Sequence, residues 1–155
     1  METALKIYTD GGCSGNPGPG GWAYIVVTDT FQGEKILARQ WGAVKNTTNN
    51  RMELSAVIEA LRALKAMTGI PRKMAVYTDS QYVQKGITEW IFNWKRNSWR
   101  TSDKKPVKNQ DLWMELDSLA GEFSITWEWV RGHSGIEYNE QCDQMTQQAI
   151  SLVNR

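Results

Sequence analysis

Short runs of apolar and β-forming residues, separated by polar or glycine-rich connections, predict three strands in the first third of the chain. Segments 5–10, 22–28 and 35–44 are rich in β-forming residues, and short connections separate them. Between the first two strands, residues 11–21 hold six glycines and two prolines, so we expect a turn without regular structure. Three short strands with tight connections favour an antiparallel meander.

From Asn50 onward the apolar residues recur at helical spacing. One stripe of the predicted helix contains Val57, Ala60, Leu61 and Leu64. Gly-Ile-Pro at 69–71 is a stop signal, and 74–78 again has the composition of a strand. A strand, a crossover helix and a second strand favour parallel pairing, so 5–10 and 74–78 should end at the same edge of the sheet.

The rest of the chain predicts three more helical segments and one more strand. We expect helices at 80–97 (broken at Gly86), 111–120 and 137–153, a strand at 124–130 and an exposed polar loop at 99–107. A chain of 155 residues fits one domain, which we place at 1–155. No apolar run is long enough to span a membrane, the start lacks a signal-peptide pattern, and the two cysteines indicate a reducing compartment. We therefore expect a cytoplasmic protein without a membrane partner.

The net charge is only +1, but basic residues cluster in one segment. Between Trp94 and Lys108 a single acid, Asp103, accompanies six basic residues, which indicates a local contact with a polyanion. Interleaved aromatic residues favour nucleic acid over a merely solvated surface. Core packing adequately explains the helix face of Trp90 and Trp94, whereas Trp99 is harder to bury. The candidate contacts in and beside this segment are Trp90, Trp94, Lys95, Arg96, Trp99, Arg100, Lys104, Lys105 and Lys108.

Two acids occur in nearly identical settings. Asp10 follows Ile7-Tyr8-Thr9 and Asp79 follows Val76-Tyr77-Thr78, each after a predicted strand. If those strands are parallel neighbours, the two acids lie side by side, and gathered acids without basic partners need a cation. Mg²⁺ prefers oxygen ligands, whereas one histidine and two separated cysteines cannot build a usual zinc site. Mg²⁺, with Mn²⁺ as a substitute, is therefore the expected metal.

Plainer explanations exist for each candidate acid. Glu53 lies three residues after Asn50, which is capping-box spacing, and a capping role and a metal-ligand role are about equally favoured. Asp10 could start the glycine-rich turn through an Asx bond, and Asp79 could cap the next helix. A solvated surface acid is the default reading of Asp143 in the last helix.

Several polar residues close to these acids are further candidates. His133 stands between glycines in a loop just before the acid-bearing last helix, and is a candidate for proton transfer. Thr47, Thr48, Asn49 and Asn50, at a helix start, are first of all caps, but their hydroxyl and amide groups could also contact sugar or phosphate. Asn16, just beyond Asp10, could contact the same ligand.

Taken together, these residues closely resemble the type 1 ribonucleases H, particularly the bacterial single-domain enzymes. The resemblance covers nearly the whole chain and is carried by the segments at 8–21, 47–54, 78–83, 94–96, 103–109, 127–135 and 139–143. It implies an α/β ribonuclease H-like fold, with a five-stranded mixed sheet (an antiparallel meander plus parallel strands) flanked by helices. It also implies hydrolysis of the RNA strand of RNA–DNA hybrids, leaving 5′-phosphate and 3′-hydroxyl ends, by a protein that we expect to be monomeric.

The same resemblance implies roles for individual residues. Asp10, Glu53, Asp79 and Asp143 correspond to metal-binding catalytic acids, and His133 to a histidine that assists proton transfer or product release. Contacts to the 2′-hydroxyl or base edges of the RNA are implied for Asn16, Asn49 and Asn50, and DNA-phosphate contacts for Thr48 and Asn109. The segment from Trp90 to Lys108 corresponds to a basic protrusion that holds the hybrid. The chain departs from the family pattern at 144–146, Gln-Met-Thr, where an acid and small apolar residues are usual.

Two rival functions remain open. One is another nuclease or transposase-like enzyme of the same structural superfamily, which the segment 90–108 disfavours. The other is a non-catalytic module that binds hybrids, which would have no use for four clustered acids. Hydrolysis of a labelled hybrid with and without Mg²⁺ separates the enzyme from the module.

Overall fold

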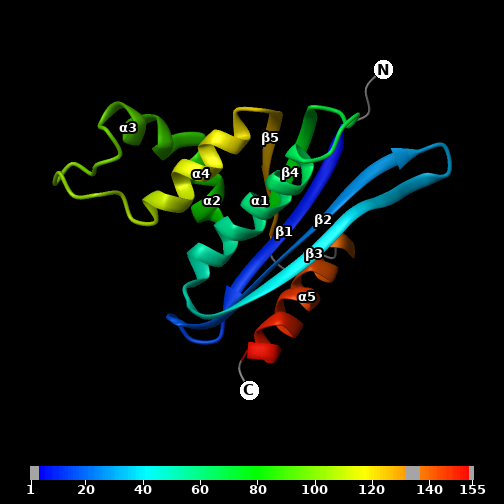
Figure 1. Cartoon of the computed structure of the whole chain (residues 1–155), viewed down its shortest axis with the longest axis horizontal. Coiled ribbons are helices and arrows are strands. Elements are labelled where there is room, and N and C mark those ends of the chain that lie inside the picture. The colour runs from blue at the N-terminus through cyan, green and yellow to red at the C-terminus, as the bar shows by residue number, and fades with distance from the viewer. Residues whose placement is uncertain (1–3, 132–136, 154–155) are drawn as a thin grey trace.

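A five-stranded mixed sheet forms the centre of the computed structural model, which describes residues 4–131 and 137–153 (Figure 1). The strands are β1 (Leu5–Cys13), β2 (Gly18–Thr30), β3 (Gly33–Thr47), β4 (Lys73–Thr78) and β5 (Ser124–Trp129), in the order β3-β2-β1-β4-β5. The first three strands pair antiparallel, whereas β4 is parallel to both β1 and β5. The predicted meander and the predicted parallel pair are both confirmed.

Helices cover both faces of this sheet. They are α1 (Asn49–Lys65), α2 (Gln81–Lys85), α3 (Ile91–Arg96), α4 (Gln110–Ala120) and α5 (Glu137–Val153), with a π-helical turn η1 (Gly86–Trp90) between α2 and α3. Figure 1 shows α1 and α4 on one side of the sheet, α5 on the other, and α3 with the loop after it projecting away from the sheet. Among the described residues, none of the helices has the length and apolar character needed to cross a membrane.

Strict alternation along β1 and β2 divides the core into two parts. Ile7 and Val26 are fully buried in the larger cluster, which includes the apolar face of α1. Ile25 points to the opposite face, where it is buried together with Cys142 of α5. Because both faces of the central strands are covered, their register is strongly specified, and so is the position of any side chain beyond the buried run.

The prediction of a turn over residues 11–21 is wrong for most of that range. β1 continues to Cys13 and β2 begins at Gly18, with Gly12 paired to Gly21. The glycines are needed here for close approach rather than for turning. A Cβ on Gly11 would lie 2.3 Å from the carbonyl carbon of Met52 in α1. The absent side chain therefore lets a strand and a helix meet backbone to backbone.

The helical segment predicted at 80–97 is interrupted at the predicted residue. The π-helical turn begins at Gly86, where an added Cβ would lie 2.0 Å from the Trp113 ring of α4. The predicted end of α1 near Gly69 is four residues too late, because the helix stops at Lys65 with Ala66 as its C-cap. Neither difference moves the elements that carry the candidate acids.

Candidate active site

Three acids from three separate elements meet at one edge of the sheet. One carboxylate oxygen each from Asp10, Glu53 and Asp79 lies within 4.8 Å of the others. The last residues paired between the parallel strands are Tyr8 and Tyr77, so Asp10 and Asp79 both lie two residues beyond that pair. Glu53 lies in the first two turns of α1, next to Met52, where the backbone of that helix approaches Gly11 of β1.

The backbone around these acids is fixed by bonds between neighbouring strands. The Thr9 hydroxyl donates to the Tyr77 carbonyl oxygen over 3.2 Å, which ties β1 to β4 beside the acids. The Trp129 indole N–H of β5 donates to the Asp79 carbonyl oxygen over 3.0 Å. The acids are therefore presented by a rigid sheet edge rather than by a free loop.

Two of the plainer explanations for these acids are wrong. Thr48 is the N-cap of α1 and accepts a bond from the Arg51 N–H, while Asn50 lies inside the helix, so Glu53 does not complete a capping box with Asn50. Ser80, and not Asp79, caps α2, because the Ser80 side chain accepts from the Val83 N–H over 3.1 Å.

Burial and mutual repulsion perturb the cluster. Burial, followed by the charge of Asp79, raises the pKa of Asp10 from 3.8 to about 7. Burial also raises the pKa of Glu53 well above its ordinary value, with the charges of Asp10 and Asp79 as the next causes. Carboxyl groups that resist ionisation together are typical of sites that a cation completes.

Asp143 lies on the wall of a small pocket beside this cluster. The pocket has a volume of about 30 Å³ and is lined by Thr9, Asp10, Asp79, Arg131, Asn139, Glu140 and Asp143. Asp143 is thus only partly exposed and faces the other acids, although a solvated surface acid was the default expectation.

The oxygens of this pocket fit a hydrated divalent ion. Asp79 Oδ1 and Asn139 Oδ1 are buried without a hydrogen-bond partner among the described residues. Buried acceptors without donors are costly, and carboxylate and carboxamide oxygens are suitable partners for Mg²⁺ or for the water molecules it carries. The donor set is therefore that of a hard cation.

Sequence reasoning missed two residues of this site. Asn139 precedes Asp143 by one helical turn on α5, a spacing that places both on one face and could have identified it. Thr146 is fully buried, and its hydroxyl lies 3.5 Å from the Asp10 carbonyl oxygen and lowers the pKa of the Asp10 carboxyl. No sequence signal marks Thr146, which belongs to the segment that departs from the family pattern. His133 lies outside the described residues.

The basic segment is exposed, but a buried anchor holds it in place. All six basic side chains, Lys95, Arg96, Arg100, Lys104, Lys105 and Lys108, belong to exposed residues. Val107 is 4% exposed, and its N–H donates to the Trp99 carbonyl oxygen over 3.1 Å, although the segment 99–107 was expected to be an exposed loop. Lys95 lies 3.3 Å from Asp117. The positive charges are thus presented by the end of α3 and by the segment that Val107 anchors.

The three tryptophans of this region differ in exposure. Trp94 and Trp99 pack against the core, with their ring centroids 6.4 Å apart, so the difficulty expected in burying Trp99 does not arise. Trp90 is 38% exposed and lies 6.0 Å from the Trp94 ring. Of the three, Trp90 offers the most surface to a ligand.

The polar candidates surround the start of α1. The Asn49 N–H donates to Asn16 Oδ1 over 3.2 Å, which ties the β1–β2 connection to the helix. Thr48 caps that helix, and Asn50 follows within its first turn. Asn109 is the N-cap of α4 and is bonded to Arg51 of α1 over 3.2 Å. These contacts group the polar candidates around the start of α1 and its contact with α4.

Comparisons with known proteins agree with this arrangement. A family model described as RNase H matches residues 2–151. The chain is 52% identical over 159 aligned positions to Ribonuclease H of Treponema denticola, covering 96% of this chain and 98% of the relative.

Solved structures give the same result. LC9-RNase H1, described as a type 1 RNase H with the type 2 active-site motif, matches with a TM-score of 0.86 and 31% identity, over 97% of this chain and 74% of that one. LC11-RNase H1, solved in complex with an RNA/DNA hybrid, shares the fold with a TM-score of 0.70 and 21% identity, over 97% of this chain and 99% of that one. With the family match spanning almost every described element, this chain belongs to the RNase H family.

Proposed function

We propose that the chain is a metal-dependent endoribonuclease that hydrolyses the RNA strand of RNA–DNA hybrids and leaves 5′-phosphate and 3′-hydroxyl ends. The observation that carries the proposal is the convergence of Asp10, Glu53 and Asp79 within 4.8 Å in a member of the RNase H family. A hybrid-binding module would gain nothing from acids that burial and repulsion make costly.

The acids would hold the metal, and neighbouring residues would orient the water bound to it. Asp10, Glu53 and Asp79 would hold Mg²⁺, or Mn²⁺ as its substitute, with Asp143 contributing from α5. When bound, such an ion would lower the pKa of a coordinated water and offset charge on the leaving 3′-oxygen. The unpartnered Asn139 oxygen would accept a hydrogen bond from a water in the pocket. We assign proton transfer or product release to His133.

The substrate would lie across the start of α1 and the basic segment. Asn16, Asn49 and Asn50 would contact the RNA strand at its 2′-hydroxyls or base edges, and a 2′-hydroxyl check distinguishes RNA from DNA without reading sequence. Thr48 and Asn109 would contact a phosphate of the DNA strand. The exposed cations near Lys104 would bind further phosphates, and Trp90 offers an aromatic surface. The hybrid bound to LC11-RNase H1 supports this choice of substrate.

The experiment compares four duplexes under one set of conditions. An end-labelled RNA–DNA hybrid, and the same hybrid with the label on its DNA strand, are incubated with the chain, with duplex DNA and duplex RNA as controls. We expect cleavage of the RNA strand of the hybrid alone, in Mg²⁺ and not in EDTA. Asp79→Asn should abolish cleavage, whereas Asp29→Asn, at an exposed position of β2, should not change it. Hybrid binding without cleavage by the wild-type chain would favour the module instead.

We also propose that the protein works as a cytoplasmic monomer. Both cysteines are free, with Cys142 buried and Cys13 partly buried, which is compatible with a reducing compartment. Sedimentation of the purified chain at several concentrations tests the monomer, and a concentration-dependent mass would exclude it.

A further inference from the structure

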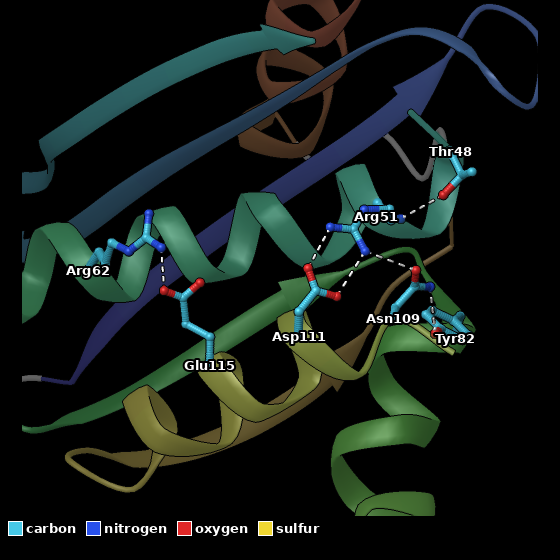
Figure 2. Close-up of polar contacts among 7 residues, drawn as sticks. All are labelled: Thr48, Arg51, Arg62, Tyr82, Asn109, Asp111 and Glu115. Carbon is cyan, nitrogen blue, oxygen red and sulfur yellow. Dashed lines mark hydrogen bonds and ion pairs between the residues drawn. The ribbon is translucent and has the colours of Figure 1, made fainter. Parts of the chain in front are cut away.

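Two arginines of α1 pair with acids of α4, and one of them also holds an asparagine (Figure 2). Arg62 donates to Glu115 of α4, which Figure 2 shows, and also to Glu59 of its own helix. Arg51 donates to Asp111 through both terminal nitrogens, over 3.0 and 2.8 Å. The same guanidinium also donates to Asn109 Oδ1 over 3.2 Å. Both arginines therefore connect α1 to α4, but only Arg51 also bonds to the side chain of Asn109.

The carboxamide of Asn109 is fixed from both ends. Its nitrogen donates to the Tyr82 hydroxyl oxygen over 3.1 Å, and the Trp113 indole N–H donates to the same oxygen over 2.9 Å. A guanidinium carries only donors, so the carboxamide oxygen must face Arg51 and the amide nitrogen must face Tyr82. One amide N–H is left over, and Asn109 can therefore offer a donor to a ligand.

Asn109 is held in an unusual backbone conformation without a capping benefit. It lies at φ 60° and ψ 30°, in the left-handed region, and its side chain makes no capping bond to α4. Asparagine at an N-cap ordinarily contributes that bond. Here its side chain is committed instead to α1 and Tyr82, and a backbone outlier with a displaced side chain is typical of binding sites.

Thr48 offers the same kind of group. Its hydroxyl oxygen accepts from the Arg51 N–H over 3.3 Å, which leaves the hydroxyl hydrogen free to donate. Figure 2 shows Thr48, Arg51 and Asn109 together at the same end of α1. Glu53 lies two residues after Arg51, and Lys108 directly precedes Asn109. Two donors without a partner among the described residues, one on Thr48 and one on Asn109, suit a ligand that only accepts, and a phosphate diester oxygen is such a ligand.

We propose that Arg51, held by Asp111, is a positioning residue that turns the Asn109 carboxamide so that its free N–H meets a phosphate of the DNA strand. This inference rests on the proposed function. Three of the five guanidinium N–H groups are already used, two on Asp111 and one on Asn109. We therefore assign Arg51 to hold the carboxamide, and the double-mutant cycle below separates this role from direct phosphate binding. The lysine side chain has no planar fork and cannot hold both partners in the same geometry.

The test compares one substitution at two matched positions. Arg51→Lys and Arg62→Lys both keep the charge and both alter an ion pair between α1 and α4. We expect Arg51→Lys to raise KM for the hybrid about tenfold, the factor that corresponds to about 1.4 kcal/mol, with kcat retained. Arg62→Lys should leave both constants within about twofold, and thermal melting of the two variants compares their purely structural effects.

A double-mutant cycle with Asn109→Ala separates a positioning role from a direct one. If Arg51 acts through the carboxamide, Arg51→Lys changes KM little once Asn109 is alanine, and the two single variants raise KM to a similar degree. Arg62→Lys should be additive with Asn109→Ala. Should Arg51→Lys melt well below the Arg62 control, the side-chain amide NMR signal of Asn109 provides a second measurement. We expect that signal to shift on hybrid binding in the wild type and in Arg62→Lys, and less in Arg51→Lys.

The outcomes distinguish the inference from the proposed function. A wild-type chain that does not cleave the hybrid contradicts the proposed function. A wild type that cleaves, with Arg51→Lys indistinguishable from Arg62→Lys, overturns only the role of Arg51. The role of Arg51 is also overturned if Arg51→Lys raises KM by the same factor in the wild type and in Asn109→Ala, because Arg51 would then act independently of the carboxamide.

Discussion

Replacing Asp10 by asparagine should abolish cleavage and, in metal-free buffer, stabilise the fold. The folded-state pKa of Asp10 is raised from 3.8 to about 7, chiefly by burial and then by Asp79. A rise of this size corresponds to a ceiling of about 4 kcal/mol of lost stability in the fully ionised state. Because the asparagine amide must also be desolvated, we expect a gain of about 2 kcal/mol, or a Tm higher by about 4–8 °C for a chain of this length.

The sign of the pH dependence follows from the direction of the shift. Between pH 4 and pH 7, roughly, the folded chain holds a proton on Asp10 that the unfolded chain has released, so wild-type stability falls as the pH rises through this window. Above it, the penalty is complete. The variant lacks this titration, so its advantage should be large at pH 8 and small at pH 4.

Thermal melting in EDTA at both pH values measures this advantage, with Asp29→Asn as the control at an exposed position. Saturating Mg²⁺ should reverse the order, because binding at 100 times Kd contributes about 2.7 kcal/mol to a chain that holds the ion. An unchanged or lower Tm for Asp10→Asn in EDTA at pH 8 would refute the account of a strained acid cluster. An equal gain at pH 4 would show that the titration of Asp10 is not the cause.

Two further predictions concern the basic segment and the packing of the π-helical turn. Replacing Lys104 and Lys105 by alanine should reduce the slope of log Kd for the hybrid against log salt by about 0.9 for each lost phosphate contact. An unchanged slope would exclude both lysines from the contact with the hybrid. Lys35→Ala, at an exposed position, is the control. Gly86→Ala should destabilise the fold by about 1–3 kcal/mol in urea, because the new Cβ would overlap an indole ring at 2.0 Å. At Gly121 the nearest atoms are 3.6 Å away, so alanine there should cost less, and equal losses would contradict the packing argument.

Local patterns were sufficient to predict the elements and the meeting of two acids. Each of the two Tyr-Thr-Asp segments lies at the end of the parallel pairing between β1 and β4. The crossover rule predicts that pairing, and so it places Asp10 and Asp79 at the same edge of the sheet. Glu53 was left between two roles because spacing alone cannot distinguish a cap from a ligand. The choice depends on which residue is the N-cap. The N-cap is Thr48, so Asn50 already lies inside the helix and cannot form a capping box with Glu53.

Contacts between distant segments were beyond such patterns. The glycines of 11–21 have the composition of a turn, but Gly20 and Gly21 are paired in a sheet, and their neighbours, Met52 and Ala149, are distant in sequence. Trp99 seemed hard to bury among charged residues because the adjacent Trp94 ring, reached through a turn with positive φ, is not visible in a linear pattern. Composition indicates the local structure that a residue favours, whereas the conformation at these positions is determined by tertiary neighbours that are distant in sequence or joined by an unusual turn.

The contact between Gly11 and α1 makes the distance between two of the proposed metal ligands a property of the main chain. Asp10 is the neighbour of Gly11, and Glu53 is the neighbour of Met52, whose carbonyl carbon would lie 2.3 Å from any Cβ on Gly11. Even a methyl group would have to push the helix away from the strand, and both carboxylates would move apart with their backbones. If these acids bind an ion as proposed, selection for its affinity can act on a residue that has no side chain and never touches the ion.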